Sequence, residues 1–251
     1  HTRYYAVTEF RRVLFRSRRL DKDCYVDFDR IFAVSDETAG VLAGVYPECQ
    51  QKLSVFHNLI DTEAIRQKAL SPAEKSMHEG IRLLTVGRLT PQKGFDCAVY
   101  ALKLLLEKQY PVYWYIIGEG PEYGRLTQLA RSLHVEDHFI FLGMQTNPYP
   151  YFKMADFYIH ATRFEGKSIA IQEAQVLGCA IAASDCSGNR EQIVSGVDGL
   201  LCPFSPEGIA NAVEYLIEHP QTAQSFGRAA AQKACHFEND IHMIRDLLYS
   251  P

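Results

Sequence analysis

Two glutamates, Glu165 and Glu173, have seven residues between them where the sequence changes from strand to turn to helix. An apolar run at 156–160 predicts a strand, and a helix is predicted over 168–177, before Gly178. Glu165 then follows the carboxyl end of a strand, and Glu173 lies about one turn into the next helix. Both can face the crevice where open α/β sheets bind ligands, beside the anion-binding N–H groups of a helix start. Most glutamate pairs are solvated surface charge, so the pair depends on the rest of the chain.

A second group of charged residues follows an earlier predicted strand, at 81–86. Arg88 and Lys93 lie in a loop bounded by Gly87 and Gly94, and these glycines permit tight turning. Two cations in such a loop suit a pyrophosphate, which Arg binds in bidentate fashion while Lys acts as a point charge. The loop has no Walker spacing, and either cation alone reads equally well as solvated loop charge.

The elements needed to position these loops alternate regularly from Ile81 onward. Apolar runs predict strands, and i, i+3, i+4 patterns predict helices of about 10 to 15 residues between them. The predicted strands are 81–86, 112–117, 139–142, 156–160, 179–184 and 199–201, and the predicted helices are 95–108, 122–133, 168–177, 189–195, 206–218, 221–234 and 241–249. Residues 147–154 are expected to be a short connection. This alternation predicts an α/β fold with a doubly wound, Rossmann-like parallel sheet.

The first part of the chain is less regular, and we expect a domain boundary near residue 60. Small strand and helix pieces at 29–56 are too few to close a domain, which predicts a remnant over residues 1–60 and a second domain over 61–251. Residues 66–80 read as a linker or surface insertion. Residues 1–20 carry six arginines and one acid, which indicates either a basic face for an anionic membrane or an irregular chain end.

Composition excludes several classes of protein. The chain has 251 residues, of which 47% are hydrophobic, and a net charge of −4, so no basic field indicates nucleic acid. No apolar run approaches the roughly 18 residues of a membrane span. The seven cysteines form no Cys-x-x-Cys pair and have no histidine at zinc spacing, so we expect a reduced, cytoplasmic protein without a metal site.

Several short motifs occur in an order that resembles a known family. They resemble the donor-binding domain of retaining, family 4 type glycosyltransferases of the GT-B fold, over about residues 29–235, and the run from Glu165 to Ala174 resembles transferases of exopolysaccharide or capsule assembly. The motifs are Gly87-Arg-Leu89, Gln92-Lys-Gly94, Gly118-Glu-Gly120-Pro121, Phe141-Leu-Gly143, Glu165 with Glu173, and Gly196-Val-Asp-Gly199-Leu-Leu201. The resemblance implies a GT-B carboxyl-terminal domain that follows a remnant of the acceptor domain, and we expect this chain to be a fragment.

The resemblance also implies roles for individual residues. Arg88 and Lys93 would bind the diphosphate of a nucleotide-sugar, which we expect to be a UDP-sugar. Glu173 would hold the ribose, and Glu165 the transferred sugar. Residues near the base and along the sugar and phosphate would be Gly120, Gly143, Met144, Gly166, Lys167, Ser168 and Ile169. Many relatives carry Phe-Gly where this chain has Lys167-Ser168, which leaves the identity of the sugar open.

The chemistry implied is transfer of a hexosyl group with retention, from the nucleotide-sugar to a polysaccharide or lipid-linked acceptor. Arg88, Lys93 and a helix N-terminus would stabilise the charge that develops on the leaving diphosphate, and we expect no divalent metal and no separate cofactor. Loss of one such group typically raises the barrier by about 3 kcal/mol. The expected location is cytoplasmic, with peripheral contact at the inner face of the membrane as a further expectation.

Other interpretations stay open at this point. The chain can be a non-catalytic nucleotide-sugar binding fragment, a sugar-nucleotide epimerase of the same fold, or a hydrolase with paired carboxylates, although a dibasic loop argues against hydrolysis. His160 reads more readily as a structural, hydrogen-bonded histidine than as a site residue. Asp156 and Arg163 read as members of local ion pairs, and Trp114 as core.

Overall fold

The computed structural model describes residues 4–7, 25, 27–58 and 60–235. Its main feature is a six-stranded sheet in the order β6-β5-β4-β7-β8-β9, in which every neighbouring pair is parallel. The strands are β4 (Ile81–Val86), β5 (Val112–Ile117), β6 (Phe139–Gly143), β7 (Phe157–His160), β8 (Ala180–Ser184) and β9 (Leu200–Cys202). The winding direction reverses between β4 and β7, so these two strands flank the topological switch point.

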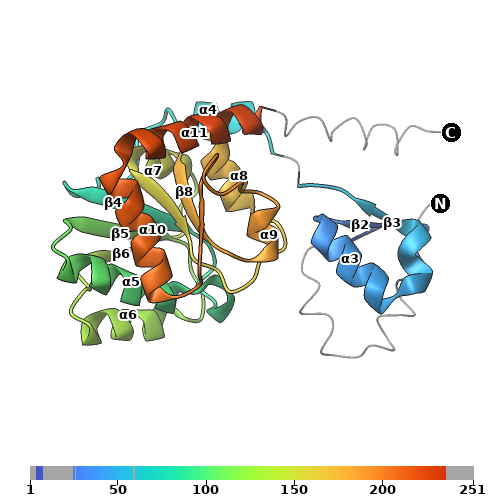
Figure 1. The fold of residues 1–251 in the computed structure, drawn as a ribbon, viewed down its shortest axis with the longest axis horizontal. Coiled ribbons are helices and arrows are strands. Elements are labelled where there is room, and N and C mark those ends of the chain that lie inside the picture. The colour runs from blue at the N-terminus through green and yellow to red at the C-terminus, as the bar shows by residue number, and fades with distance from the viewer. Residues whose placement is uncertain (1–3, 8–24, 26, 59, 236–251) are drawn as a thin grey trace.

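Helices cover both faces of this sheet (Figure 1). α5, α6 and α10 pack against one face, whereas α7 and α8 pack against the other, and α11 contacts both α8 and β8. The helices are α4 (Thr62–Lys68), α5 (Phe95–Glu107), α6 (Tyr123–Ser132), α7 (Tyr149–Met154), α8 (Ile169–Val176), α9 (Ser187–Arg190), α10 (Pro206–Glu218) and α11 (Pro220–Ala234), with a 3-10 turn, η2 (Pro91–Lys93), before α5. The predicted α/β, doubly wound parallel fold is confirmed.

The core lies in two layers because successive strand residues point to opposite faces. In β5, Trp114 and Ile116 enter the cluster under α5 and α10, whereas Tyr115 and Ile117 enter the cluster under α7 and α8. Trp114 is fully buried, and its indole N–H donates to the Thr85 hydroxyl at 2.9 Å. The prediction that Trp114 is a core residue is therefore confirmed.

A smaller three-stranded parallel sheet stands beside this unit, on the side of α9 (Figure 1). It consists of β1 (Tyr4–Val7), β2 (Arg30–Ala33) and β3 (Leu53–Val55), with α3 (Asp36–Val45) and the 3-10 helix η1 (Pro47–Lys52) between β2 and β3. A hydrogen bond joins the two parts: the backbone N–H of Glu37 in α3 donates to the carboxylate of Glu191 at 2.8 Å. The division into domains at residues 60 and 61 stays a prediction.

Some predicted elements were wrong in detail. Residues 147–154 contain the helix α7 rather than a connection, and the linker predicted from residue 66 overlaps α4, which begins at Thr62. α4 is a helix because the Asp61 side chain caps it, accepting from the Ala64 N–H at 2.8 Å, and Ile65 packs against α8. The helix predicted at 189–195 is shorter and begins earlier, as α9. The terminal helix predicted at 241–249 lies outside the described residues, as do most of residues 1–20.

Candidate functional site

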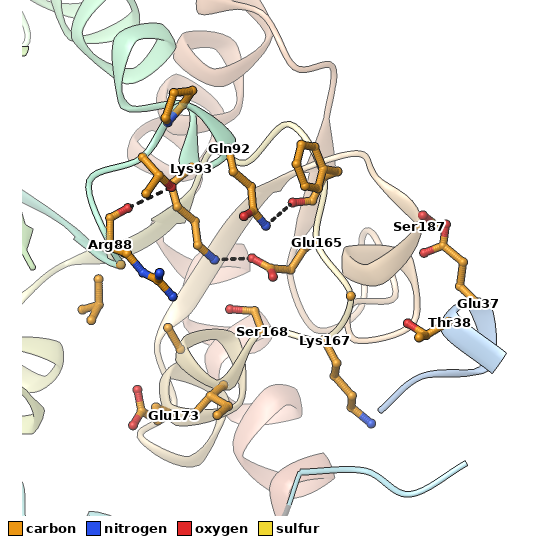
Figure 2. A pocket seen from close by; sticks show the side chains of 18 of the residues that line it. Glu37, Thr38, Arg88, Gln92, Lys93, Glu165, Lys167, Ser168, Glu173 and Ser187 are labelled. Carbon is orange, nitrogen blue, oxygen red and sulfur yellow. Dashed lines mark hydrogen bonds and ion pairs between the residues drawn. The ribbon is translucent and has the colours of Figure 1, made fainter. Parts of the chain in front are cut away.

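A cavity of about 630 Å³ opens at the carboxyl edge of the sheet, where the switch point between β4 and β7 lies. The loop after β4 forms one wall, the loop after β7 and the start of α8 form another, and α3 faces them (Figure 2). Eight of the predicted site residues line this cavity: Arg88, Lys93, Glu165, Gly166, Lys167, Ser168, Ile169 and Glu173. The four charged residues on which the sequence argument depends are therefore brought together, as predicted.

Three predicted residues are not part of the lining. Gly143 ends β6, Gly120 and Met144 lie in the loops after β5 and β6, and Met144 is 70% exposed. Gly120 has a packing reason of its own, because a Cβ there would come within 2.3 Å of the Leu89 carbonyl oxygen. Absence of a side chain at Gly120 therefore lets the turn after β5 support the basic loop from behind.

The two loops that carry the charges are joined directly. The Arg163 N–H donates to the Gln92 carbonyl oxygen at 2.8 Å, and the Gln92 side chain donates to the Phe164 carbonyl oxygen at 3.1 Å. The Arg163 guanidinium also pairs with Asp96 in the first turn of α5, at 2.7 Å. These bonds fix the spacing between the basic loop and the loop of Glu165, and they confirm that Arg163 belongs to a local ion pair.

Lys93 and Glu165 form an ion pair inside the cavity (Figure 2). Their side chains are 20% and 10% exposed, so the pair is largely shielded from water. Arg88 lies beside them and is exposed, and its guanidinium forms no ion pair with another described residue. In the described structure, Arg88 is thus free to meet an anion, whereas Lys93 already holds a carboxylate.

Glu165 has a second partner that sequence reasoning missed. His160, the last residue of β7, is 2% exposed, and its Nε2 lies 3.3 Å from Glu165 Oε2. Burial would raise the pKa of Glu165, but the hydrogen bond from His160 and the charge of Lys93 outweigh it and lower that pKa to about 2. Burial lowers the pKa of His160 against the opposing effect of Glu165, so the imidazole is neutral at neutral pH.

Glu173 lies further along the cavity and differs electrostatically from Glu165. Its carboxylate accepts a hydrogen bond from the Tyr149 hydroxyl at 3.0 Å. Burial raises the pKa of Glu173, and the Tyr149 hydrogen bond only partly offsets this. Burial and the neighbouring carboxylate in turn raise the pKa of Tyr149 to about 12, so the phenol keeps its proton. Glu173 is therefore a carboxylate poised to accept further hydrogen bonds from a ligand.

The start of α8 completes this wall. The Ser168 hydroxyl accepts from the Ile171 N–H and caps the helix, and Gly178 has the positive φ of 68° expected just after the helix. Behind the loop, Gly188 of α9 approaches so closely that a Cβ would lie 2.1 Å from the Gly166 carbonyl oxygen. The position of the Glu165–Gly166 backbone is thus fixed by α9 as well as by α8.

Further cavity residues were not foreseen. Glu37, Thr38 and Val41 come from α3, and Ser187 comes from α9. The sequence offered no pattern linking α3 to residues more than a hundred positions away, so only the fold reveals this wall. His160 carried a weak signal, because it ends a predicted strand five residues before Glu165.

Two other motifs are structural in the described chain. Asp198, 4% exposed, accepts from the Val194 N–H at 2.7 Å and pairs with Lys233 of α11 at 2.7 Å, so the Gly196–Leu201 motif ties a loop to a helix. Asp156 pairs with Arg82 at 3.0 Å, as the ion-pair interpretation predicted.

No group of three potential acidic, histidine or cysteine metal ligands occurs within the described residues. Among those residues, too, every helix is too short or too polar to cross a bilayer.

The fold and the switch-point site define an α/β protein of the GT-B class, and structural comparison agrees. HepE from Anabaena, solved in complex with UDP-glucose, superposes with a TM-score of 0.85 at 19% identity, covering 99% of this chain and 72% of HepE. A family model for Glycosyl transferases group 1 matches residues 66–233. The chain therefore belongs to the glycosyl transferases of group 1.

Curated relatives agree with this family. A Campylobacter jejuni enzyme, N-acetylgalactosamine-N,N'-diacetylbacillosaminyl-diphospho-undecaprenol 4-alpha-N-acetylgalactosaminyltransferase, is 30% identical over 200 residues, covering 79% of this chain and 53% of the relative. Glycogen synthase from Mycobacterium tuberculosis is 30% identical over 189 residues, covering 72% of this chain and 44% of the relative. The chain thus spans about half the length of these relatives.

Proposed function

We propose that this chain is the sugar-donor half of a retaining, family 4 type glycosyltransferase. It would bind a UDP-sugar and move its hexosyl group to a polysaccharide or lipid-linked acceptor in exopolysaccharide-type assembly. The observation that carries the proposal is the meeting of Arg88, Lys93, Glu165 and Glu173 in one cavity. HepE was solved with UDP-glucose, and the name of the Campylobacter enzyme includes a diphospho-undecaprenol, which supports the ligand and acceptor classes.

The charges support a specific orientation of the ligand. Arg88 and Lys93 follow β4 and would bind the diphosphate, with the first N–H groups of α8 nearby. Glu173 would accept hydrogen bonds from the ribose hydroxyls, and Glu165 from hydroxyls of the sugar. Lys167 lines the same cavity and extends away from Lys93 (Figure 2).

The reaction needs stabilisation of two opposite charges. As the anomeric C–O bond breaks, negative charge develops on the leaving diphosphate and positive charge on the sugar ring. Arg88 and Lys93 would stabilise the first, and the carboxylate of Glu165, held ionised by its low pKa, would lie near the second. We propose that these protein cations act without a divalent ion, and that the protein works in the cytoplasm with peripheral contact at the membrane.

Binding is the direct test. We expect isothermal titration of the chain with UDP-glucose in EDTA to give binding, and Arg88→Ala to weaken it about 10- to 100-fold, because a hydrogen bond to a charged group is lost. Arg131→Ala, an exposed arginine of α6 outside the cavity, is the matched control. Binding that appears only after magnesium is added would contradict the metal-independent form. The anomeric configuration of a transfer product, read by NMR, tests retention.

A second function has one observation in its favour. The chain spans about half the length of its curated relatives, so it can act as a binding module that holds the nucleotide-sugar without transferring it. Binding of UDP-glucose without hydrolysis or transfer would favour this alternative. A change of configuration within the nucleotide-sugar itself would instead favour an epimerase.

A further inference from the structure

His160 is a buried titratable group to which the proposed function assigns no part. It is the last residue of β7, is 2% exposed, and contacts Glu165, which lines the cavity. Its ring contacts two side chains: Nδ1 lies 3.2 Å from the Tyr158 hydroxyl, and Nε2 lies 3.3 Å from Glu165 Oε2. Tyr158 is itself fully buried on the same strand. The histidine therefore links the protein core to a carboxylate of the site.

The chemistry of these partners fixes where the protons are. An ionised carboxylate only accepts hydrogen bonds, so Nε2 of His160 carries a proton and donates it to Glu165. Because burial keeps the ring neutral, Nδ1 is the acceptor, and the Tyr158 hydroxyl donates to it. The result is a directed chain from Tyr158 through His160 to Glu165. Lys93 is the other charged group that faces this carboxylate.

The two donors to Glu165 meet the same oxygen. Lys93 Nζ and His160 Nε2 both bind Oε2, whereas no hydrogen bond to Oε1 occurs among the described residues. One oxygen is thus held from two sides, and the other stays available at the cavity wall. If a diphosphate draws Lys93 toward itself, His160 still holds Oε2 in place.

We propose that His160 is a positioning residue, which fixes Glu165 Oε2 through its Nε2–H so that Oε1 is presented to a hydroxyl of the transferred sugar. This inference rests on the proposed function for the identity of the ligand. The contact between His160 and Glu165 does not depend on the proposed function, because it exists in the chain without ligand. The two statements can therefore be tested separately.

The ligand-free test measures Glu165 directly. In the full chain, carbon-13 NMR of the glutamate carboxyls over pH should show the pKa of Glu165 rising toward its ordinary value in His160→Leu. His160→Gln, whose amide can still donate, should keep that pKa low. An unchanged Glu165 titration in the Leu variant would overturn the positioning role. If His160→Leu does not fold, Tyr158→Phe, which removes the donor to Nδ1, should raise the pKa partway, and no rise there would overturn the proposal.

The ligand test compares UDP with UDP-glucose. We expect His160→Leu to change the affinity for UDP by no more than about twofold. The same variant should lower the ratio of the UDP-glucose affinity to the UDP affinity about tenfold, and His160→Gln should restore that ratio. A merely structural role would weaken both ligands together, and that result would overturn the sugar contact. If the unsubstituted chain binds neither ligand, the proposed function fails, while the NMR titration still decides the role of His160.

Discussion

The carboxylates of Glu165 and Glu173 share one cavity, yet their surroundings shift their pKa values in opposite directions. Donors from His160 and Lys93 lower the pKa of Glu165 despite its burial, whereas burial dominates at Glu173 and raises its pKa. The charged form of Glu165 is thus already stabilised by the protein, whereas the carboxylate of Glu173 can accept further hydrogen bonds from a ligand. This asymmetry has separate consequences for stability at the two residues.

Glu165 should make the protein sensitive to acid. Its ordinary pKa of 4.5 falls to about 2 on folding, so its stabilisation is fully present above pH 4.5 and is lost as the pH falls toward 2. A shift of this size corresponds to on the order of 3 kcal/mol. Urea unfolding between pH 6 and pH 3 should therefore show a smaller loss of unfolding free energy in Glu165→Gln than in the unsubstituted chain. Parallel curves for the two proteins would contradict this assignment.

Glu173 should behave in the opposite sense. Because its pKa is raised, the folded state disfavours its charged form, and stability is lost as the pH rises from the ordinary value of 4.5 through the raised pKa of the folded state. Glu173→Gln is therefore expected to raise the unfolding free energy at pH 7 while it weakens UDP binding about 10- to 100-fold. Denaturant unfolding and calorimetric titration of the same preparation measure both effects. A variant that loses stability together with affinity would show that Glu173 supports the fold instead.

The sequence predicted which residues meet but not what holds them. Arg88, Lys93, Glu165 and Glu173 were predicted to converge because parallel strands place the loops that follow them at one edge. His160 was judged structural because no partner was visible in the sequence. Its partners are a core tyrosine and a loop carboxylate, and their contact depends on the path of the loop after β7. Side-chain geometry of that kind is not encoded in local spacing.

At the scale of elements, the loop of Glu165 is held by close packing as well as by hydrogen bonds. α9 begins against its carbonyl groups, and Gly188 is the point of contact. α9 has four residues and no apolar period, which is why its bounds were predicted poorly. α7 was missed for a similar reason, since its six residues include a proline and offer less than two turns of pattern. The longer α10 was predicted with its observed bounds.

Gly188→Ala should disturb this packing. The added Cβ would lie 2.1 Å from one loop carbonyl oxygen and 2.2 Å from another, so the loop of Glu165 must shift. Overpacking of this kind costs about 1–3 kcal/mol, and UDP-glucose binding should weaken as well. Gly124→Ala in α6 is the matched control, because nothing lies within 4 Å of its Cβ and alanine favours a helix. Chemical unfolding of both variants measures the difference, and equal stabilities would refute the packing argument.

At the scale of the whole molecule, ligand binding and stability are linked. The cavity is lined by α3 as well as by the large sheet, so a ligand that fills it contacts both parts of the described chain. The Glu37–Glu191 contact already lies between them. Binding should therefore stabilise the described parts together rather than the large sheet alone.

UDP should raise the melting temperature in a concentration-dependent way. At about one hundred times its dissociation constant, a ligand that binds only the folded state adds about 2.7 kcal/mol. For a chain of this size, that corresponds to a rise of roughly 5–10 °C. Differential scanning calorimetry with UDP, and with uridine as the control lacking the diphosphate, measures the effect. Equal shifts with both compounds would argue against a role for the basic loop.

The strand order has one more consequence, for how this protein can diversify. β4 and β7 lie in the middle of the sheet, and the two charged loops leave from their ends, each anchored in the core by one buried residue, Leu89 or Ala161. Exchanges at the exposed positions of these loops would alter the choice of ligand and leave the packing of the sheet intact. New specificities are therefore accessible through a few residues, without a new scaffold.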